Sequence, residues 1–179
     1  MKKVCVFCGS SMGKDQALVD SAQQLGVSLA QKEIGLVYGG GSVGLMGVIA
    51  DSVLENKGQV WGVIPKFLAD WEVAHKDLTH MEVVVSMHER KKRMYDLSDA
   101  FLVLPGGIGT LDEFFEVLTW SQLGLHQKPI YLINESGFYD AAVQHLKHIH
   151  EQGFLSKKHL DLVRVKSSCE EAITDWMSM

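Results

Sequence analysis

The sequence predicts an α/β fold: a three-layer sandwich in which a mainly parallel sheet of about seven strands is flanked by helices on both faces. Short β-rich runs alternate with helical runs along the whole chain, which is typical of repeated strand–helix–strand units. Residues 101–104 (FLVL) are apolar at every position, as expected of a strand covered on both faces. One domain spanning residues 1–179 is expected, because a chain of this length buries roughly 70% of its unfolded surface in a single core.

The expected strands are the short apolar runs, and the expected helices are the longer runs between them. The strands cover residues 3–7, 35–38, 59–64, 81–86, 100–104, 129–133 and 162–165. The helices cover residues 16–32, 45–56, 87–98, 110–123, 139–152 and 170–177. No internal repeat or low-complexity linker interrupts this series.

The first strand follows two lysines, an arrangement that also begins a signal peptide. The apolar run after Lys3 is shorter than the core of about 7 to 15 residues that a signal peptide needs, so a strand is the better interpretation. No apolar run approaches the roughly 18 residues of a transmembrane helix. We therefore expect a cytoplasmic protein with no membrane partner.

Composition and charge narrow the function classes further. The formal net charge of −5 argues against non-specific binding of nucleic acid, which normally needs a basic face.

The three cysteines, Cys5, Cys8 and Cys169, are sparse enough to suit a reducing compartment. Cys5 and Cys8 form a C-x-x-C, but their odd separation in a strand points them to opposite faces, which favours core packing over redox or metal chemistry. The eight histidines match no metal template, so no metal is expected.

Three glycine-bearing loops, residues 8–13, 39–44 and 105–109, follow expected strands. The carboxyl ends of parallel strands meet at one edge of a sheet, where α/β proteins bind ligands. We therefore expect the three loops to surround one site.

Two of these loops resemble nucleotide-binding motifs that they do not complete. Gly39-x-Gly41-x-x-Gly44 matches the dinucleotide fingerprint, but it follows the second strand, and no acidic residue ends the next strand to bind a ribose. Residues 9–14 have one residue too few between their glycines for a P-loop, and Asp15 replaces the expected Ser or Thr. A dinucleotide cofactor and a nucleoside triphosphate are both disfavoured.

The third loop, residues 105–113 (PGGIGTLDE), joins a strand to a helix start and is suited to bind an anion. Glycines allow close approach of a ligand, and the first amides of a helix are unpaired donors at the positive end of its dipole. The loop also carries a carboxylate, Glu113. Two interpretations of Glu113 remain open here, because Thr110 and Glu113 also form the T-x-x-E pattern of a helix capping box.

A second S-x-x-E pattern, Ser86 with Glu89, precedes a basic run at residues 90–93. Cations at a helix start are disfavoured by the dipole. Solvated surface residues are the ordinary explanation of such a run, and the alternative is that the run faces an anion.

The helix-like run 114–123 is apolar over more than one face. Such a helix is either enclosed in the core or covered by a second subunit. We favour a homodimer.

Three segments together resemble the LOG family of cytokinin riboside 5′-monophosphate phosphoribohydrolases, many of which carry the label "lysine decarboxylase-like". These segments are residues 39–47 (GGGSVGLMG), 87–91 (MHERK) and 105–113. The resemblance extends from residue 4 to the last helix. It implies a Rossmann-like homodimer that cleaves the N-glycosidic bond of a nucleoside 5′-monophosphate, a cytokinin nucleotide or AMP, into free base and ribose 5-phosphate without a cofactor.

The resemblance also implies roles for individual residues. It places Arg90 and Glu113 on the catalytic pair. The substrate-binding positions that it implies are Glu72, Lys91, Gly106, Gly107, Ile108, Gly109, Thr110, Leu111, Asp112 and Thr119. Asp112 stands where relatives often have glutamate, and residues 67–73 differ from the proline-containing segment of plant members.

Two alternatives to this enzyme stay open at the level of sequence. One is a non-catalytic nucleotide-binding protein that uses the same phosphate loop. The other is the decarboxylase of the family's older label, which needs a lysine that binds pyridoxal phosphate. The glycine loops offer no convincing lysine for that role.

Overall fold

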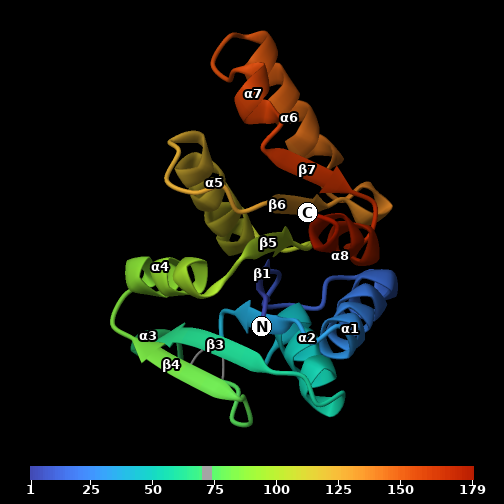
Figure 1. Ribbon diagram of the computed structural model, residues 1–179, viewed down its shortest axis with the longest axis vertical. Helices are drawn as coiled ribbons and strands as arrows, with labels where there is room; N and C mark the ends of the chain where they lie inside the picture. Colours follow the sequence, from blue (N-terminus) through green and yellow to red (C-terminus); the bar gives the residue numbers. More distant parts are fainter. Residues whose placement is uncertain (70–73) are drawn as a thin grey trace.

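The computed structural model describes residues 1–69 and 74–179 and confirms the α/β architecture (Figure 1). Its seven strands form one sheet in the order β4-β3-β2-β1-β5-β6-β7, and every neighbouring pair is parallel. The strands are β1 (Lys3–Phe7), β2 (Gly35–Tyr38), β3 (Val60–Pro65), β4 (His80–Val84), β5 (Ala100–Val103), β6 (Ile130–Ile133) and β7 (Val163–Lys166). All lie within two residues of their expected ends.

The six expected helices are also present. They are α1 (Gln16–Gln31), α2 (Gly44–Glu55), α4 (Met87–Leu97), α5 (Ile108–Gln122), α6 (Asp140–Glu151) and α8 (Cys169–Met177). Three further short elements were not expected: α3 (Lys66–Ala69), α7 (Lys157–Leu160) and the 3-10 turn η1 (Glu135–Gly137). Each has three or four residues, which is too few to show helical periodicity in a sequence.

The sheet separates two hydrophobic cores. Val4 and Val6 of β1 pack into a cluster with α1, α2 and α8, whereas Cys5 and Phe7 of the same strand pack into a cluster with α4, α5 and α6. Helices α1, α2 and α8 accordingly lie on one side of the sheet, and α4 and α5 lie on the other (Figure 1). Because both faces are covered, the strands are apolar at nearly every position, which is why they were recognisable in the sequence.

The cysteines follow the same alternation. Cys5 and Cys8 fall in opposite clusters, as expected, and all three cysteines are buried free thiols. Burial raises the pKa of the Cys5 and Cys8 thiols, with a smaller contribution from the charge of Glu113. Burial also raises the pKa of Cys169, to about 12. The thiols therefore stay protonated near neutral pH.

The chain changes direction across the sheet between β1 and β5. From β1 it proceeds outward through β2, β3 and β4, and it then returns to the other side of β1 to add β5, β6 and β7. The helices that follow β1 and β5, α1 and α5, therefore lie on opposite faces of the sheet and leave a crevice at its carboxyl edge, the usual place for a ligand in an open parallel sheet. Within the described ranges, no helix has the length and apolar character needed to cross a membrane.

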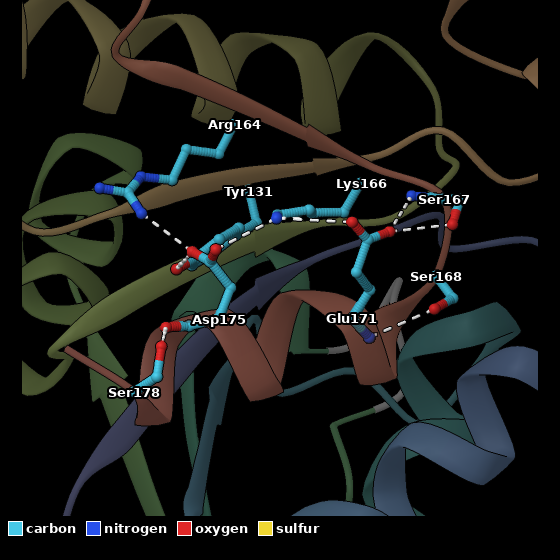
Figure 2. A network of polar contacts seen from close by, with 8 residues as sticks. All are labelled: Tyr131, Arg164, Lys166, Ser167, Ser168, Glu171, Asp175 and Ser178. Carbon is cyan, nitrogen blue, oxygen red and sulfur yellow. Dashed lines mark hydrogen bonds and ion pairs between the residues drawn. The ribbon is translucent and has the colours of Figure 1, made fainter.

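A polar network fastens the last helix to the edge of the sheet (Figure 2). Asp175 of α8 accepts hydrogen bonds from the Tyr131 hydroxyl of β6 at 2.7 Å, from Arg164 of β7 at 2.9 Å and from Lys166 of β7 at 3.2 Å. These donors, with Tyr131 first, lower the pKa of the Asp175 carboxyl to about 2. The network stabilises α8 and β7 against β6 only while Asp175 is ionised.

The start of α8 is fixed by the same group of residues. The Ser168 hydroxyl accepts a hydrogen bond from the Glu171 amide at 3.2 Å, and the Glu171 carboxylate accepts one from the Ser167 amide at 3.0 Å. These contacts satisfy amides that the first turn of a helix leaves unpaired. Both ends of α8 are therefore anchored.

The Asp175 network predicts a pH-dependent part of the stability. A carboxyl whose folded pKa lies below its unfolded value stabilises the fold above the unfolded pKa of about 4, and this contribution is lost as the pH falls towards 2. In Asp175→Asn this contribution is absent at every pH, so the urea midpoint should fall less between pH 5 and pH 3 than in the wild type. An Asp161→Asn variant, which removes an exposed partner of Lys157, is the matched control and should follow the wild type. An equal pH dependence in Asp175→Asn and wild type would contradict the prediction.

Candidate active site

The three glycine loops meet at the carboxyl edge of the sheet, as expected. The Gly9 amide donates a hydrogen bond to the Pro105 carbonyl at 3.1 Å, and the Gly9 carbonyl accepts one from the Met46 amide at 3.4 Å. Gly44 has a φ of +64°, and a Cβ there would lie 2.2 Å from the carbonyl carbon of Ser10. The loop after β1 is therefore in direct contact with the loops after β2 and β5.

A cavity of about 260 Å³ opens where these loops meet. It collects residues from both sides of the crevice between β1 and β5, together with the starts of α4 and α5. The described residues that line it are Cys8, Gly9, Ser10, Met46, Leu68, Met87, Arg90, Gly107, Ile108, Gly109, Thr110, Asp112 and Glu113.

Arg90 supplies the buried cation of this cavity. Its side chain is only 4% exposed, although it lies in the first turns of α4. The guanidinium donates from Nε to the Val63 carbonyl at 3.1 Å and from Nη2 to the Gly39 carbonyl at 2.8 Å. A buried charge is costly unless it is hydrogen-bonded, and these carbonyls, one within β3 and one directly after β2, satisfy part of that need.

The glycines of the dinucleotide-like motif have packing roles in this fold. A Cβ on Gly39 would lie 2.1 Å from Arg90 Nη2, so only glycine leaves room for the guanidinium. A Cβ on Gly44 would collide with the backbone of Ser10, and a Cβ on Gly47 would lie 2.2 Å from the Ser42 carbonyl oxygen. The motif therefore packs Arg90 and the neighbouring loop.

The start of α4 confirms the pattern seen at Ser86 and Glu89. The Ser86 hydroxyl accepts from the Glu89 amide at 3.2 Å, and the Glu89 carboxylate accepts from the Val85 amide at 2.9 Å. These reciprocal contacts fix where the helix begins, and so they fix the direction of Arg90 one residue later.

The basic run after Glu89 divides among different partners. Arg90 enters the cavity, whereas Lys91 forms ion pairs with α5, Lys92 pairs with Asp96 on its own helix, and Arg93 pairs with Glu82 of β4. Lys91, Lys92 and Arg93 thus each have a carboxylate partner. Of this run, Arg90 alone lines the cavity.

The capping-box interpretation of Thr110 and Glu113, one of the two left open by the sequence, is wrong. Helix α5 begins two residues earlier, at Ile108, with Gly107 as an extended N-cap that makes no side-chain hydrogen bond. Thr110 is instead buried against Gly106, where a Cβ would lie 2.1 Å from its hydroxyl oxygen. Glu113 consequently lies in the second turn, beyond reach of the N-cap amide, and it lines the cavity.

The glycine-rich start of α5 presents its first amides to the cavity. The amides of Ile108, Gly109 and Thr110 belong to the first turn, where no intrahelical acceptor exists, and the first intrahelical bond runs from Leu111 to the Gly107 carbonyl at 3.2 Å. A Cβ on Gly107 or Gly109 would meet no atom within 4 Å, so both glycines face open space. The positive end of the helix dipole is therefore accessible to an anion.

The structure brings together most, but not all, of the residues singled out in the sequence. Arg90, Glu113, Asp112 and residues 107–110 line the cavity, whereas Gly106 lines a smaller adjoining cavity and Leu111 packs against the core. Thr119 is exposed three turns along α5, and its hydroxyl donates to the Phe115 carbonyl at 2.7 Å. Glu72 lies outside the described residues.

Lys91 also differs from the expectation. Its ammonium lies 3.0 Å from Asp112 Oδ2 and 3.0 Å from Glu116 Oε1, and it is not among the described residues that line the cavity. Partial burial lowers the pKa of Lys91, but the hydrogen bonds and charges of Glu116 and Asp112 outweigh this effect and raise the pKa overall.

Sequence reasoning did not single out several residues that line the cavity. Cys8, Ser10, Met46 and Met87 all lie inside the recognised loops or motifs, so the motifs themselves could have indicated them. Leu68 on α3 has no such signal, because it comes from a four-residue helix between motifs. Within residues 1–69 and 74–179, no group of three or more His, Cys, Asp or Glu side chains could hold a metal ion.

Fold and site together define a Rossmann-like α/β protein with a glycine-rich helix start at its topological switch point. The chain belongs to the LOG family: the family model described as "Possible lysine decarboxylase" matches residues 46–176, and relatives match nearly the whole chain. Cytokinin riboside 5′-monophosphate phosphoribohydrolase LOG1 of Arabidopsis thaliana is 43% identical over 172 residues, which are 96% of this chain and 81% of the relative. The cytokinin riboside 5′-monophosphate phosphoribohydrolase of Rhodococcoides fascians is 45% identical over 173 residues, covering 96% and 87%.

Solved structures share the fold. The X-ray structure of TM1055 aligns with a TM-score of 0.77 and 25% identity over the full length of both chains. The molybdenum cofactor binding protein of Rippkaea orientalis aligns with a TM-score of 0.73 and 21% identity over 99% of this chain and 97% of that protein. At that identity, the second likeness shows the fold alone.

The contact between Gly39 and Arg90 predicts a large effect of a single methyl group. Gly39→Ala places a Cβ against Nη2 and should destabilise the protein by about 1–3 kcal/mol, the usual cost of overpacking a filled site. Gly109→Ala is the matched control, because its Cβ meets no atom within 4 Å, and it should leave stability unchanged or raise it by up to about 1 kcal/mol. Urea unfolding measures both variants. Equal stability of Gly39→Ala and wild type would mean that the guanidinium does not occupy this place.

Proposed function

We propose that this protein hydrolyses the N-glycosidic bond of nucleoside 5′-monophosphates, namely cytokinin riboside 5′-monophosphates or AMP. The products are the free base and ribose 5-phosphate. The observation that carries the proposal is that Arg90 and Glu113 line the same cavity as the glycine-rich start of α5. Relatives that are 43% and 45% identical over 96% of the chain are named for this activity, which supports the assignment.

The 5′-phosphate is placed on the first amides of α5, residues 108–110. These amides need an acceptor, and the helix dipole adds to the attraction for a dianion. No lysine is required for this contact. Phosphate binding fixes one end of the substrate and so holds the ribose in a defined position beside the second turn of the helix.

Glu113 is placed beside C1′ of the ribose. Breaking the C–N bond develops positive charge on the sugar, as in glycoside hydrolysis, and a carboxylate at this position stabilises that charge or orients the attacking water. The hydroxyl of the water is transferred to C1′, and its proton goes to the departing base. Hydrolysis of this kind consumes only water, so the proposal includes no cofactor.

Arg90 is placed on the ribose hydroxyls or the phosphate. Its guanidinium is already oriented by the carbonyls of Val63 and Gly39, so binding does not require the side chain to find its position. Such pre-organisation reduces the entropy that the substrate must overcome. Asp112 and Glu72 complete the set of proposed substrate contacts, and Thr119 is proposed to act only if a second subunit brings it to a site.

The decarboxylase alternative receives less support from the cavity. None of the described residues that line it is a lysine, and the nearby Lys91 is engaged with two carboxylates. A non-catalytic nucleotide-binding protein remains the second candidate, because the same helix start would hold a phosphate without any chemistry.

We further propose that the protein is a cytoplasmic homodimer. Three buried free thiols suit a reducing compartment. The apolar character of α5 is only partly explained by the core: Phe114, Val117 and Leu118 are buried, whereas Phe115 is 39% and Leu123, just beyond the helix, 66% exposed. The exposed apolar side chains on and next to α5 are where a second copy would pack.

The assignment of Glu113 predicts a specific loss of rate. Wild-type protein incubated with AMP or N6-isopentenyl-AMP, without added cofactor, should release free base and ribose 5-phosphate. Glu113→Gln should remain folded but lose about 10² to 10⁴ in kcat, which is the typical contribution of a positioned acid or base. Glu151→Gln on α6 is the control and should retain full activity.

Other results of the AMP incubation would distinguish the remaining possibilities. Binding of AMP without product release would favour the non-catalytic protein, and neither binding nor release would overturn the proposed function. Near-normal turnover by Glu113→Gln would remove Glu113 from the chemistry while leaving the activity in place.

The dimer is tested by mass in solution. The wild type should behave as twice 19.9 kDa in light scattering, and Phe115→Asp should behave as a single chain, because a carboxylate would be buried at the interface. Phe154→Asp alters another exposed phenylalanine and should leave the dimer intact. A monomeric wild type would contradict the proposal.

A further inference from the structure

We infer that Lys91 is a positioning residue that holds the helix of Arg90 against the helix of Glu113, in place of the substrate-binding role that the family resemblance implies for it. The inference rests on the proposed function. It extends that function to a second residue, Glu116, which sequence reasoning did not single out.

Lys91 on α4 forms ion pairs with two carboxylates on α5. The Lys91 ammonium lies 3.0 Å from Asp112 Oδ2 and 3.0 Å from Glu116 Oε1, and its side chain is only 12% exposed. Asp112 and Glu116 are four residues apart and so project from one face of α5 on successive turns. An ammonium held by both carboxylates is fixed along the helix as well as across it.

Two members of this ion triad are sequence neighbours of the proposed catalytic residues. Lys91 directly follows Arg90 on α4, and Asp112 directly precedes Glu113 on α5. The ion triad therefore joins the two helices at the level of the cavity. Farther along, the rings of Tyr95 on α4 and Trp120 on α5 also meet edge to face, with their centroids 5.1 Å apart.

The positive charge of Lys91 also balances negative charge near the cavity. Asp112 and Glu116 place two carboxylates close to Glu113, beside a helix start that is proposed to bind a dianionic phosphate. Lys91 offsets part of this negative charge, and it keeps its own proton because its pKa is raised. Two of its three N–H donors are already used by the carboxylates.

The test separates positioning from substrate binding by comparing kcat with KM for AMP hydrolysis. Lys91→Met should lower kcat by about 10- to 100-fold with a change in KM below about 3-fold, because a small misplacement of catalytic groups affects the chemical step. Lys92→Met is the matched control. It removes the next lysine, which is 57% exposed and paired with Asp96 on its own helix, and it should leave both constants unchanged.

Glu116 provides the decisive comparison. If Lys91 acts through the triad, Glu116→Gln should also lower kcat, and the double variant should be no slower than Lys91→Met alone. If Lys91 binds the substrate directly, Lys91→Met should raise KM at least tenfold and Glu116→Gln should have little effect. That result, or unchanged kinetics in both single variants, would overturn the inference.

Failure of the proposed function would be visible separately, as an absence of base release by the wild type. The triad is then tested by the urea midpoints of four proteins: the wild type, Lys91→Met, Glu116→Gln and the double variant. Shifts of Lys91→Met and Glu116→Gln that do not add would support a joint role in holding the helices, and strictly additive shifts would overturn it.

Discussion

The buried guanidinium of Arg90 is the constraint on which the rest of the site depends. A cation removed from water must be hydrogen-bonded, and here two backbone carbonyls, those of Val63 in β3 and Gly39 after β2, accept its hydrogen bonds. This arrangement requires a glycine after β2, because any side chain would occupy the place of the guanidinium. It also requires α4 to start at a fixed residue, which the Ser86 and Glu89 contacts ensure. The sheet, the glycine loop and the helix cap thus all serve the placement of one side chain.

The second half of the site follows from the topology of the sheet. The reversal of strand order between β1 and β5 sends the helices that follow these strands to opposite faces and makes room for the start of α5. Glycines at 107 and 109 keep that helix start open, and Glu113 one turn later faces the same cavity. A cation from one side of the crevice and a carboxylate from the other are thereby brought around one anion-binding position. Family membership and the names of the relatives are consistent with this combination.

Much of this was accessible from the sequence, because the features concerned are local. Strands buried on both faces are apolar throughout, and the start of α4 has a recognisable cap. The start of α5 was assigned to the wrong residue because Thr110 and Glu113 have the spacing of a capping box, while the true N-cap, Gly107, has no side chain to signal it. Neighbours in a helix diverge by about 100°, so Arg90 enters the cavity while Lys91 meets α5. Which of the two residues enters the cavity depends on how α4 and α5 pack, and the sequence of the basic run does not determine this.

The distribution of the buried thiols makes the molecule its own reporter of local opening. Cys5 lies in the core between the sheet and α4 and α5, Cys169 is the first residue of α8 and contacts Ser21 of α1, and Cys8 lies at the cavity. A thiol reagent added to the native protein reaches Cys5 when α4 and α5 separate from the sheet, Cys169 when α8 separates from α1, and Cys8 when the cavity is empty. Alkylation rates read residue by residue would therefore compare the opening of the two faces without any introduced label.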